Sequence, residues 1–326
     1  MQAQTITIIG MQRLGVSVAL ALRAALPQVT LVGHDKDGST AREVKEKMGA
    51  VDKVEWNLVR AAAQADIVVL AVPFVELRET LEAIGHDLQT HTLLLDMSSL
   101  KGPGVKWAAK AIHSGHYVGV RPVLAANVLE DGRTDYTAAA ADLFRNSVFC
   151  LMPTADVDAR AVQTAVHFGQ LLGATPYFLD PNEYDSLIQG VETVPGLMAA
   201  AMYGAISKET GWRDMLRFAN QPFALTTQPL GNGEDVAQLV LYDQQATLRW
   251  LDAFLGELQL VRQWVQQGDR HSLTALLGQM GDHRAAWLRD RAKNDWAEAK
   301  MPTVENRGLT EQMLGSWVSE RMGRDE

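Results

Sequence analysis

The segment "IIGMQRLGVSVALAL", residues 8–22, joins a short apolar run to a stretch rich in alanine and leucine. Gly10 ends the apolar run, and Gly15 opens the second stretch, whose composition is typical of a helix. Glycines between a strand and a helix let a phosphate approach the backbone N–H groups at the helix N-terminus. The spacing therefore predicts a loop that binds the pyrophosphate of a dinucleotide.

The loop departs from the pattern G-x-G-x-x-G at its second glycine, where Gln12 stands. A Cβ at this position obstructs the pyrophosphate, so the loop must widen or the phosphate must shift. The side chain of Gln12 or Arg13 could reach a displaced phosphate through a hydrogen bond or its charge. We expect the loop to bind the cofactor through Gly10, Gln12, Arg13, Leu14 and Gly15.

Asp35 ends the second predicted strand, about 20 residues after the loop. A carboxylate at this point pairs with the ribose 2′-hydroxyl of NAD and repels the 2′-phosphate of NADP. Lys36 stands beside it and leaves NADP open, so the sequence favours NAD without deciding firmly. The alternative is a domain of the same fold that has lost its ligand, with Asp35 as a solvated acid at a strand end.

The first 180 residues alternate apolar runs with helical segments, and these elements must position the loop. Continuous apolar strands separated by helices indicate a parallel sheet buried on both faces, which is an α/β, doubly wound, Rossmann-type domain. The strands are expected at residues 5–10, 29–35, 65–73, 90–99, 116–123, 147–153 and 175–180.

Residues 182–322 show only helical patterns, broken by glycine and proline. Residues 238–268 predict one amphipathic helix of about thirty residues, because no proline interrupts them. A helix this long extends past the core of a small domain, so part of its apolar stripe is expected to bury against a second subunit. The chain is thus divided into a dinucleotide-binding domain, 1–180, and an all-helical substrate and dimerisation domain, 181–326. A monomeric all-α domain is the alternative to the homodimer.

Composition excludes several classes of partner. The 326 residues carry a net charge of −9, which gives no broad basic surface for nucleic acid or an anionic membrane. There is one cysteine, Cys150, and we expect no disulfide and no metal site. No signal peptide or membrane span is evident, so we expect a cytoplasmic protein.

Further segments, taken in order with the loop, resemble the prephenate/arogenate dehydrogenase family over nearly the full chain. They are "ADIVVLAVPFVELRETLEAI" (65–84), "LLLDMSSLKGPGVKWA" (93–108), "YVGVRPVLAAN" (117–127), "DLFRNSVFCLMPT" (142–154), "EYDSLIQGVETVPGLMAAAMYGAI" (183–206) and "FANQPFALTTQ" (218–228). The resemblance implies a Rossmann-type domain followed by a helical dimerisation domain. It also implies hydride transfer from a ring substrate to a nicotinamide with loss of carbon dioxide, a step of tyrosine biosynthesis.

The resemblance also implies roles for individual residues. Val72 and Pro73 would lie along the cofactor. Ser99 would form a hydrogen bond near the nicotinamide and the catalytic group, and Lys101 follows it on the same loop as a substrate-binding candidate. For Ser99, the competing interpretation is a loop residue that caps the next helix.

Several substrate-handling positions differ from the family pattern. Arg121 stands where the family has the histidine that takes the proton from the substrate hydroxyl. A guanidinium has no lone pair and stays protonated, so it cannot act as that base, although it can bind a carboxylate or stabilise negative charge. Glu192 begins "ETVPG", in which both histidines of the family's helix are missing. We expect Glu192 to contact substrate, and we hypothesise that it pairs with Arg121. Ala224 and Gln228 stand near the place where an arginine for the substrate carboxylate is expected.

Three functions remain open. The first is an NAD(P)-dependent oxidoreductase that acts on a small carboxylated substrate other than prephenate, with Ser99 and Arg121 orienting or polarising it. The second is a homologue that has lost catalysis and serves as a ligand sensor or structural dimer. The third is true prephenate or arogenate dehydrogenase activity in which the proton passes through water.

Overall fold

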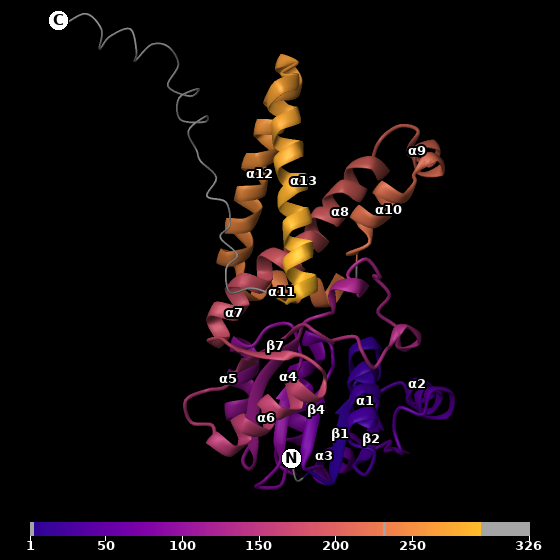
Figure 1. Ribbon diagram of the computed structural model, residues 1–326, viewed down its shortest axis with the longest axis vertical. Helices are drawn as coiled ribbons and strands as arrows, with labels where there is room; N and C mark the ends of the chain where they lie inside the picture. The colour runs from indigo at the N-terminus through magenta and orange to yellow at the C-terminus, as the bar shows by residue number, and fades with distance from the viewer. Residues whose placement is uncertain (1–2, 231–232, 295–326) are drawn as a thin grey trace, which may run out of the picture.

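The computed structural model describes residues 3–230 and 233–294 (Figure 1). A sheet and its covering helices form one half of the molecule, and the helices from α7 onward form the other. In Figure 1, the two long helices α12 and α13 rise side by side from the sheet half, and α8 and α10 form a second, shorter projection.

The sheet has eight strands in the order β3-β2-β1-β4-β5-β6-β7-β8. The first six strands in this order, from β3 to β6, are parallel to one another. β7 pairs antiparallel with β6, and β8 pairs parallel with β7. The strands are β1 (Thr5–Ile9), β2 (Thr30–His34), β3 (Lys53–Val54), β4 (Ile67–Leu70), β5 (Leu93–Asp96), β6 (His116–Pro122), β7 (Val148–Met152) and β8 (Thr175–Phe178). All seven predicted strands are confirmed, whereas the two-residue β3 at the sheet edge is too short to leave a pattern.

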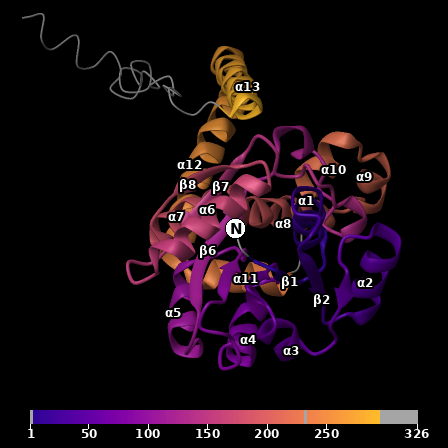
Figure 2. The ribbon, with the colours of Figure 1, turned by 60° about the horizontal axis from the view of Figure 1, so that its bottom comes forward.

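Helices cover both faces of this sheet. One face packs against α1 (Arg13–Ala25), α2 (Gly38–Glu43) and α6 (Ala159–Leu171), and the other against α3 (Leu58–Ala63), α4 (Phe74–Ile84) and α5 (Gly102–Ala111). Figure 2 shows α3, α4 and α5 gathered along one side. Each face has its own hydrophobic core; we call the one under α1, α2 and α6 the first core and the one under α3, α4 and α5 the second. Along β4, Ile67 and Val69 belong to the first core, and Val68 and Leu70 belong to the second. Burial of both faces explains why the strands are continuously apolar.

The second half contains helices alone within the described residues from 181 onward. They are α7 (Pro181–Ile188), the π-helical turn η4 (Gln189–Thr193), α8 (Val194–Ser207), α9 (Trp212–Phe218), α10 (Gln221–Thr227), α11 (Gly233–Tyr242), α12 (Gln244–Gln267) and α13 (Arg270–Lys293). The predicted fold class, a doubly wound Rossmann-type sheet followed by helices, is confirmed. Among the described helices, none combines the length and the apolar character needed to cross a membrane.

The single helix predicted for residues 238–268 is wrong in one respect, because the helix breaks at Asp243. This residue has φ −119° and ψ 75°, outside the helical region, and its carboxylate accepts a hydrogen bond from Ala246 N at 2.9 Å. Asp243 therefore ends α11 and caps the N-terminus of α12. A side chain that caps the backbone competes with helix continuation, a signal that apolar periodicity alone does not carry.

Two acids of the helical half join it to the sheet half. Asp185 on α7 accepts hydrogen bonds from Lys101 N at 2.6 Å and Gly102 N at 2.8 Å, at the start of α5. Asp235 on α11 accepts one from Val75 N at 2.9 Å, at the start of α4. Burial raises the pKa of both carboxyl groups, and the backbone N–H groups partly oppose this. These bonds satisfy helix N-termini that face the second half of the molecule.

Candidate nucleotide and substrate site

The carboxyl ends of β1, β4, β5 and β6 meet at one edge of the sheet, because these strands are parallel. The strand order reverses beside β1, and open α/β sheets bind ligands in the crevice at such a point. The glycine loop lies there. Gly10 has φ +96°, and a Cβ on it would lie 2.4 Å from Ala71 O. A Cβ on Gly15 would lie 2.0 Å from Gly10 O, so neither position accepts a side chain without a shift of the backbone.

Gln12 directly precedes α1, and its side chain is exposed and makes no capping hydrogen bond. Its backbone is extended, with φ −90° and ψ −171°, a conformation that any residue can adopt. The backbone therefore does not require glycine at this position. Leu14 is half-buried, next to the first core. The Gln12 side chain is therefore free to move aside, or to donate to a bound phosphate.

The side chain of Arg13 is buried under the segment 131–138, which we call the strap. Its guanidinium donates to the carbonyl oxygens of Asp131 at 2.7 Å, Arg133 at 2.7 Å and Ala138 at 3.1 Å. It also pairs with the Asp131 carboxylate at 3.2 Å. The backbone N–H of Arg13 donates to Thr134 O at 3.0 Å. Arg13 therefore holds the strap over the N-terminus of α1, and its own amide already has a partner, as do the amides of Gly10, to His34 O at 2.9 Å, and Met11, to Asp35.

Asp35 follows β2 and faces the same loop. One carboxylate oxygen accepts from Met11 N at 2.7 Å, and the other accepts from Asp37 N at 2.9 Å. The adjacent Lys36 forms an ion pair with Glu76 in the first turn of α4. Asp35, which we predict to bind the ribose hydroxyl, thus lies beside the glycine loop and close in sequence to the Lys36–Glu76 ion pair.

Val72 and Pro73 connect β4 to α4 on the opposite side of the loop. Val72 N lies 3.2 Å from the position that a Gly10 Cβ would take. Val72 is half-buried and Pro73 is exposed. Both residues therefore border the crevice at β1.

A buried polar network lies beneath the next loop, after β5. Asp96 is fully buried and accepts hydrogen bonds from Ser98 N at 2.8 Å, Ser98 Oγ at 3.0 Å and Tyr117 Oη at 2.7 Å. Lys101 is also fully buried, with Nζ donating to Asp96 O at 2.8 Å and to Ser98 O. Burial lowers the pKa of Lys101 to about 8, although Asp96 opposes the shift. The structure thus places Lys101 under the loop, where its ammonium group holds the backbone of Asp96 and Ser98.

Ser99 lies on the outer side of this loop, half-buried, and precedes α5 by three residues. The structure gives its hydroxyl no hydrogen bond to the described residues, and the N-terminus of α5 is capped instead by Asp185. Ser99 does not therefore act as the cap of α5.

Arg121 lies near the end of β6 and joins three elements. Nη1 donates to Met97 O at 2.9 Å, and Nη2 donates to Glu192 Oε2 at 2.8 Å. The hypothesised pairing with Glu192 is confirmed. Burial opposes the charge of Arg121, but Glu192 holds its pKa above the ordinary value. Glu192 itself lies in the π-helical turn between α7 and α8, and its side chain is 41% exposed. A carboxylate held by a cation therefore faces the open side of the site.

Tyr184 is a site candidate that no motif in the sequence indicates. Its side chain packs against Cys150 and Met152 on β7, and its buried hydroxyl has no hydrogen-bond partner among the described residues. Burial raises the pKa of Tyr184 well above its usual value, with Arg121 and Glu192 nearby. A buried hydroxyl without a partner is costly unless a ligand or water satisfies it.

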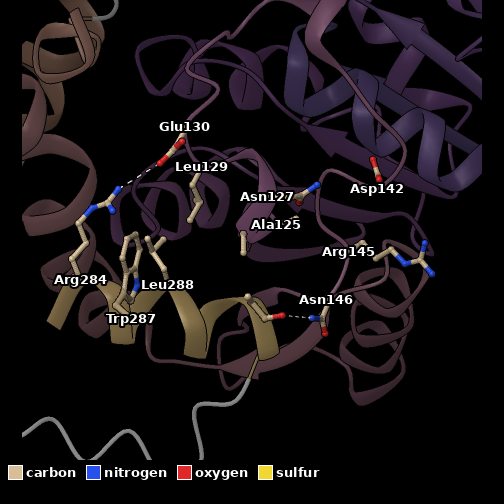
Figure 3. A pocket seen from close by; sticks show the side chains of 12 residues that line it. Ala125, Asn127, Leu129, Glu130, Asp142, Arg145, Asn146, Arg284, Trp287 and Leu288 are labelled. Atoms are coloured by element: carbon tan, nitrogen blue, oxygen red, sulfur yellow. Dashed lines mark hydrogen bonds and ion pairs between the residues drawn. The ribbon is translucent and has the colours of Figure 1, made fainter. Parts of the chain in front are cut away.

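Two further features lie apart from this site. Within the described residues, no three potential metal ligands come together. A hollow of about 670 Å³ lies between the connection from β6 to β7 and helix α13, with Trp287 and Leu288 facing Leu129 and Ala125 (Figure 3). None of the predicted site residues lines it.

The residues at the β1 crevice fit a dinucleotide in most respects. Gly10 packs closely against Ala71 and Gly15 against Gly10, Asp35 lies beside the loop, and the Gln12 side chain is exposed. Thr134 O on the Arg13 amide is the one contact that a pyrophosphate at that amide would have to replace.

Comparisons with known proteins agree with this arrangement. The family described as "Prephenate dehydrogenase, nucleotide-binding domain" matches residues 18–177, and "Prephenate dehydrogenase, dimerization domain" matches residues 180–279. The chain is 24% identical over 296 residues to a prephenate dehydrogenase of Bacillus subtilis, covering 86% of this chain and 75% of that protein. It is 23% identical over 291 residues to a cyclohexadienyl dehydrogenase of Zymomonas mobilis, covering 88% and 94%. A prephenate dehydrogenase of Aquifex aeolicus, crystallised with hydroxyphenyl propionate and NAD⁺, shares the fold with a TM-score of 0.76 at 18% identity, covering 88% and 99% of the two chains.

Proposed function

The chain belongs to the prephenate dehydrogenase family and is a nicotinamide-dependent dehydrogenase of that type, and from this premise we propose that it oxidises a small carboxylated alcohol other than prephenate. The observation that carries the proposal is the Arg121–Glu192 pair. Arg121 stands where the family resemblance puts a histidine, and it contacts Met97 O, two residues before Ser99 in the sequence. A changed acid–base group in an otherwise retained scaffold favours a changed substrate.

We assign the proton-accepting role to Glu192. Arg121 has no lone pair, whereas the Glu192 carboxylate can accept a proton and is partly exposed. NAD, when bound, supplies the acceptor for the hydride that leaves the substrate carbon. As the substrate C–H bond breaks, the hydroxyl proton passes to Glu192 and the C–O bond becomes a carbonyl. Arg121 holds Glu192 and stabilises negative charge on the substrate.

The other proposed site residues bind the cofactor or position the substrate. Gly10, Gln12, Leu14 and Gly15 form the pyrophosphate loop, with Asp35 at the ribose and Val72 and Pro73 along the cofactor. Ser99 orients the substrate near the nicotinamide. For Lys101 we propose a positioning role through the backbone of Asp96 and Ser98, because its ammonium group is fully buried. Arg13 would act through the strap.

The domain boundary and the homodimer are also part of this proposal. We place the domain boundary at residue 180, where Asp180 caps the N-terminus of α7. We also propose a homodimer through the helical half, since the dimerisation-domain family covers residues 180–279. A cytoplasmic location remains a prediction.

Replacement of Glu192 by glutamine tests the assignment. We expect Glu192→Gln to lower kcat by about 10²-fold, because the amide cannot take the proton, while NADH affinity stays unchanged. The assay follows reduced nicotinamide with prephenate, arogenate and a panel of carboxylated secondary alcohols. Glu183→Gln, an exposed position on α7, is the matched control. If the wild type turns over prephenate and Glu192→Gln does so at the same rate, Glu192 is not the proton acceptor and the substrate is not one other than prephenate. Both parts of the proposal would then be wrong.

The alternative function is a ligand sensor or structural dimer without catalysis. It is favoured by Gln12 in the loop and by Thr134 O on the Arg13 amide, since both hinder a pyrophosphate. The third function, prephenate or arogenate oxidation with a water-relayed proton, predicts turnover of those substrates that Arg121→Ala abolishes.

A further inference from the structure

We infer that Glu76 selects the dinucleotide, by pairing with Lys36 and so denying the 2′-phosphate of NADP its cation. The inference rests on the proposed nucleotide binding and names a residue that sets its specificity. Sequence position alone does not reveal this role, because Lys36 and Glu76 are 40 residues apart.

The ion pair lies across the nucleotide crevice. Lys36 follows β2, and Glu76 lies in the first turn of α4, which follows β4. Strands β2 and β4 flank β1 on either side, so the contact between the two side chains crosses the carboxyl end of β1. The glycine loop and Asp35 meet at the same place.

The two partners differ in freedom. The Glu76 side chain is 29% exposed and the Lys36 side chain 76% exposed, so the carboxylate is the more fixed partner and the ammonium group the more mobile one. The hydrogen bond with Glu76 raises the pKa of Lys36, and the charges of Asp35 and Glu234 act in the same direction. Lys36 is therefore a cation within an acidic surrounding.

This arrangement treats the two dinucleotides differently. The ribose 2′-hydroxyl of NAD needs an acceptor, which Asp35 offers. A 2′-phosphate at the same point meets the carboxylates of Asp35 and Glu76, and the lysine that would bind it is already paired. Without Glu76, the mobile Lys36 side chain is available to the phosphate as a point charge.

The test compares NADH and NADPH binding by nicotinamide fluorescence in the full-length protein. We expect Glu76→Gln to tighten NADPH binding by about threefold to tenfold while NADH binding changes less than twofold, a size typical of partly exposed charge contacts. Glu79→Gln is the matched control, since it removes the same charge from an exposed position on α4 and should change neither constant. Adding Lys36→Gln to Glu76→Gln should abolish the gain.

The outcomes separate this inference from the proposed function. If NADH binds but the NADPH constant is the same in Glu76→Gln and wild type, Glu76 does not select the cofactor and the inference is wrong. The same holds if Glu79→Gln produces an equal gain, because the effect is then one of overall charge. If neither nucleotide binds to the wild type or to any of the variants, the proposed function itself fails.

Discussion

The proposed proton transfer depends on two residues, Arg121 and Glu192. The family resemblance predicts a histidine at Arg121, which cannot accept a proton, and the contact at 2.8 Å puts the Glu192 carboxylate beside it. The pairing was predictable from residue types, because two substrate-handling positions had changed together. The partner that holds the other side of the guanidinium, Met97 O, is a backbone atom and leaves no signal in the sequence.

Lys101 gives a prediction about pH. Burial lowers the pKa of Lys101 to about 8 in the folded protein, from the ordinary value of 10.5 that we expect in the unfolded chain. The unfolded state therefore binds more protons between these values, and this residue makes the protein more stable as pH rises through the window. Relative to Lys101→Met, we expect the free energy of unfolding of the wild type to rise by about 1–3 kcal/mol across it.

Urea unfolding at one pH below 8 and one inside the window measures this difference. Lys106→Met, at an exposed position on the same helix α5, is the control and should follow the wild type. A constant difference between wild type and Lys101→Met would contradict a lowered pKa of Lys101 in the folded protein.

The helices of the second half carry an apolar surface that residues 3–230 and 233–294 leave exposed. On α12, Leu248, Leu255, Leu258 and Val265 are 56%, 53%, 48% and 63% exposed. Their spacing of seven and three residues puts them on one stripe of the helix. Such a stripe is expected to pack against another helix.

A charge on this stripe should therefore separate the subunits. We expect sedimentation analysis to give a dimer for the wild type and a monomer for Leu258→Glu, because the interface would have to bury an unpaired carboxylate. Gln259→Glu adds the same charge at the adjacent exposed residue and should remain a dimer. A monomeric wild type would support the alternative of a monomeric helical domain, and a dimeric Leu258→Glu would exclude this stripe from the interface.

Helices and strands were predictable where a long run of apolar residues marks them. They were less predictable where a single side chain determines the end of an element. The seven strands were predictable from their apolar runs, since both faces of the sheet are buried. The end of α11 depends on the Asp243 cap, and the reversal of β7 depends on the path of the chain after β6. Similarly, the loop spacing predicts that Arg13 reaches a phosphate, whereas its guanidinium contacts a strap about 120 residues away in sequence.

The molecule as a whole combines the nucleotide-binding and dimerisation domains of the prephenate dehydrogenase family with the substrate site that we propose. The family match covers both halves, and the glycines, Asp35 and the residues after β4 keep their places around the β1 crevice. A nicotinamide dinucleotide must therefore bind despite Gln12 and the strap. All the proposed chemistry depends on that binding.

Titration of the full-length protein with NADH, followed by nicotinamide fluorescence, tests this requirement most directly. We predict saturable binding by the wild type, with Gln12→Gly binding somewhat more tightly because the Cβ no longer opposes the pyrophosphate. If NADH binds to Gln12→Gly and not to the wild type, the account is contradicted: the second glycine is then indispensable, and the natural protein is a sensor or structural dimer rather than a dehydrogenase.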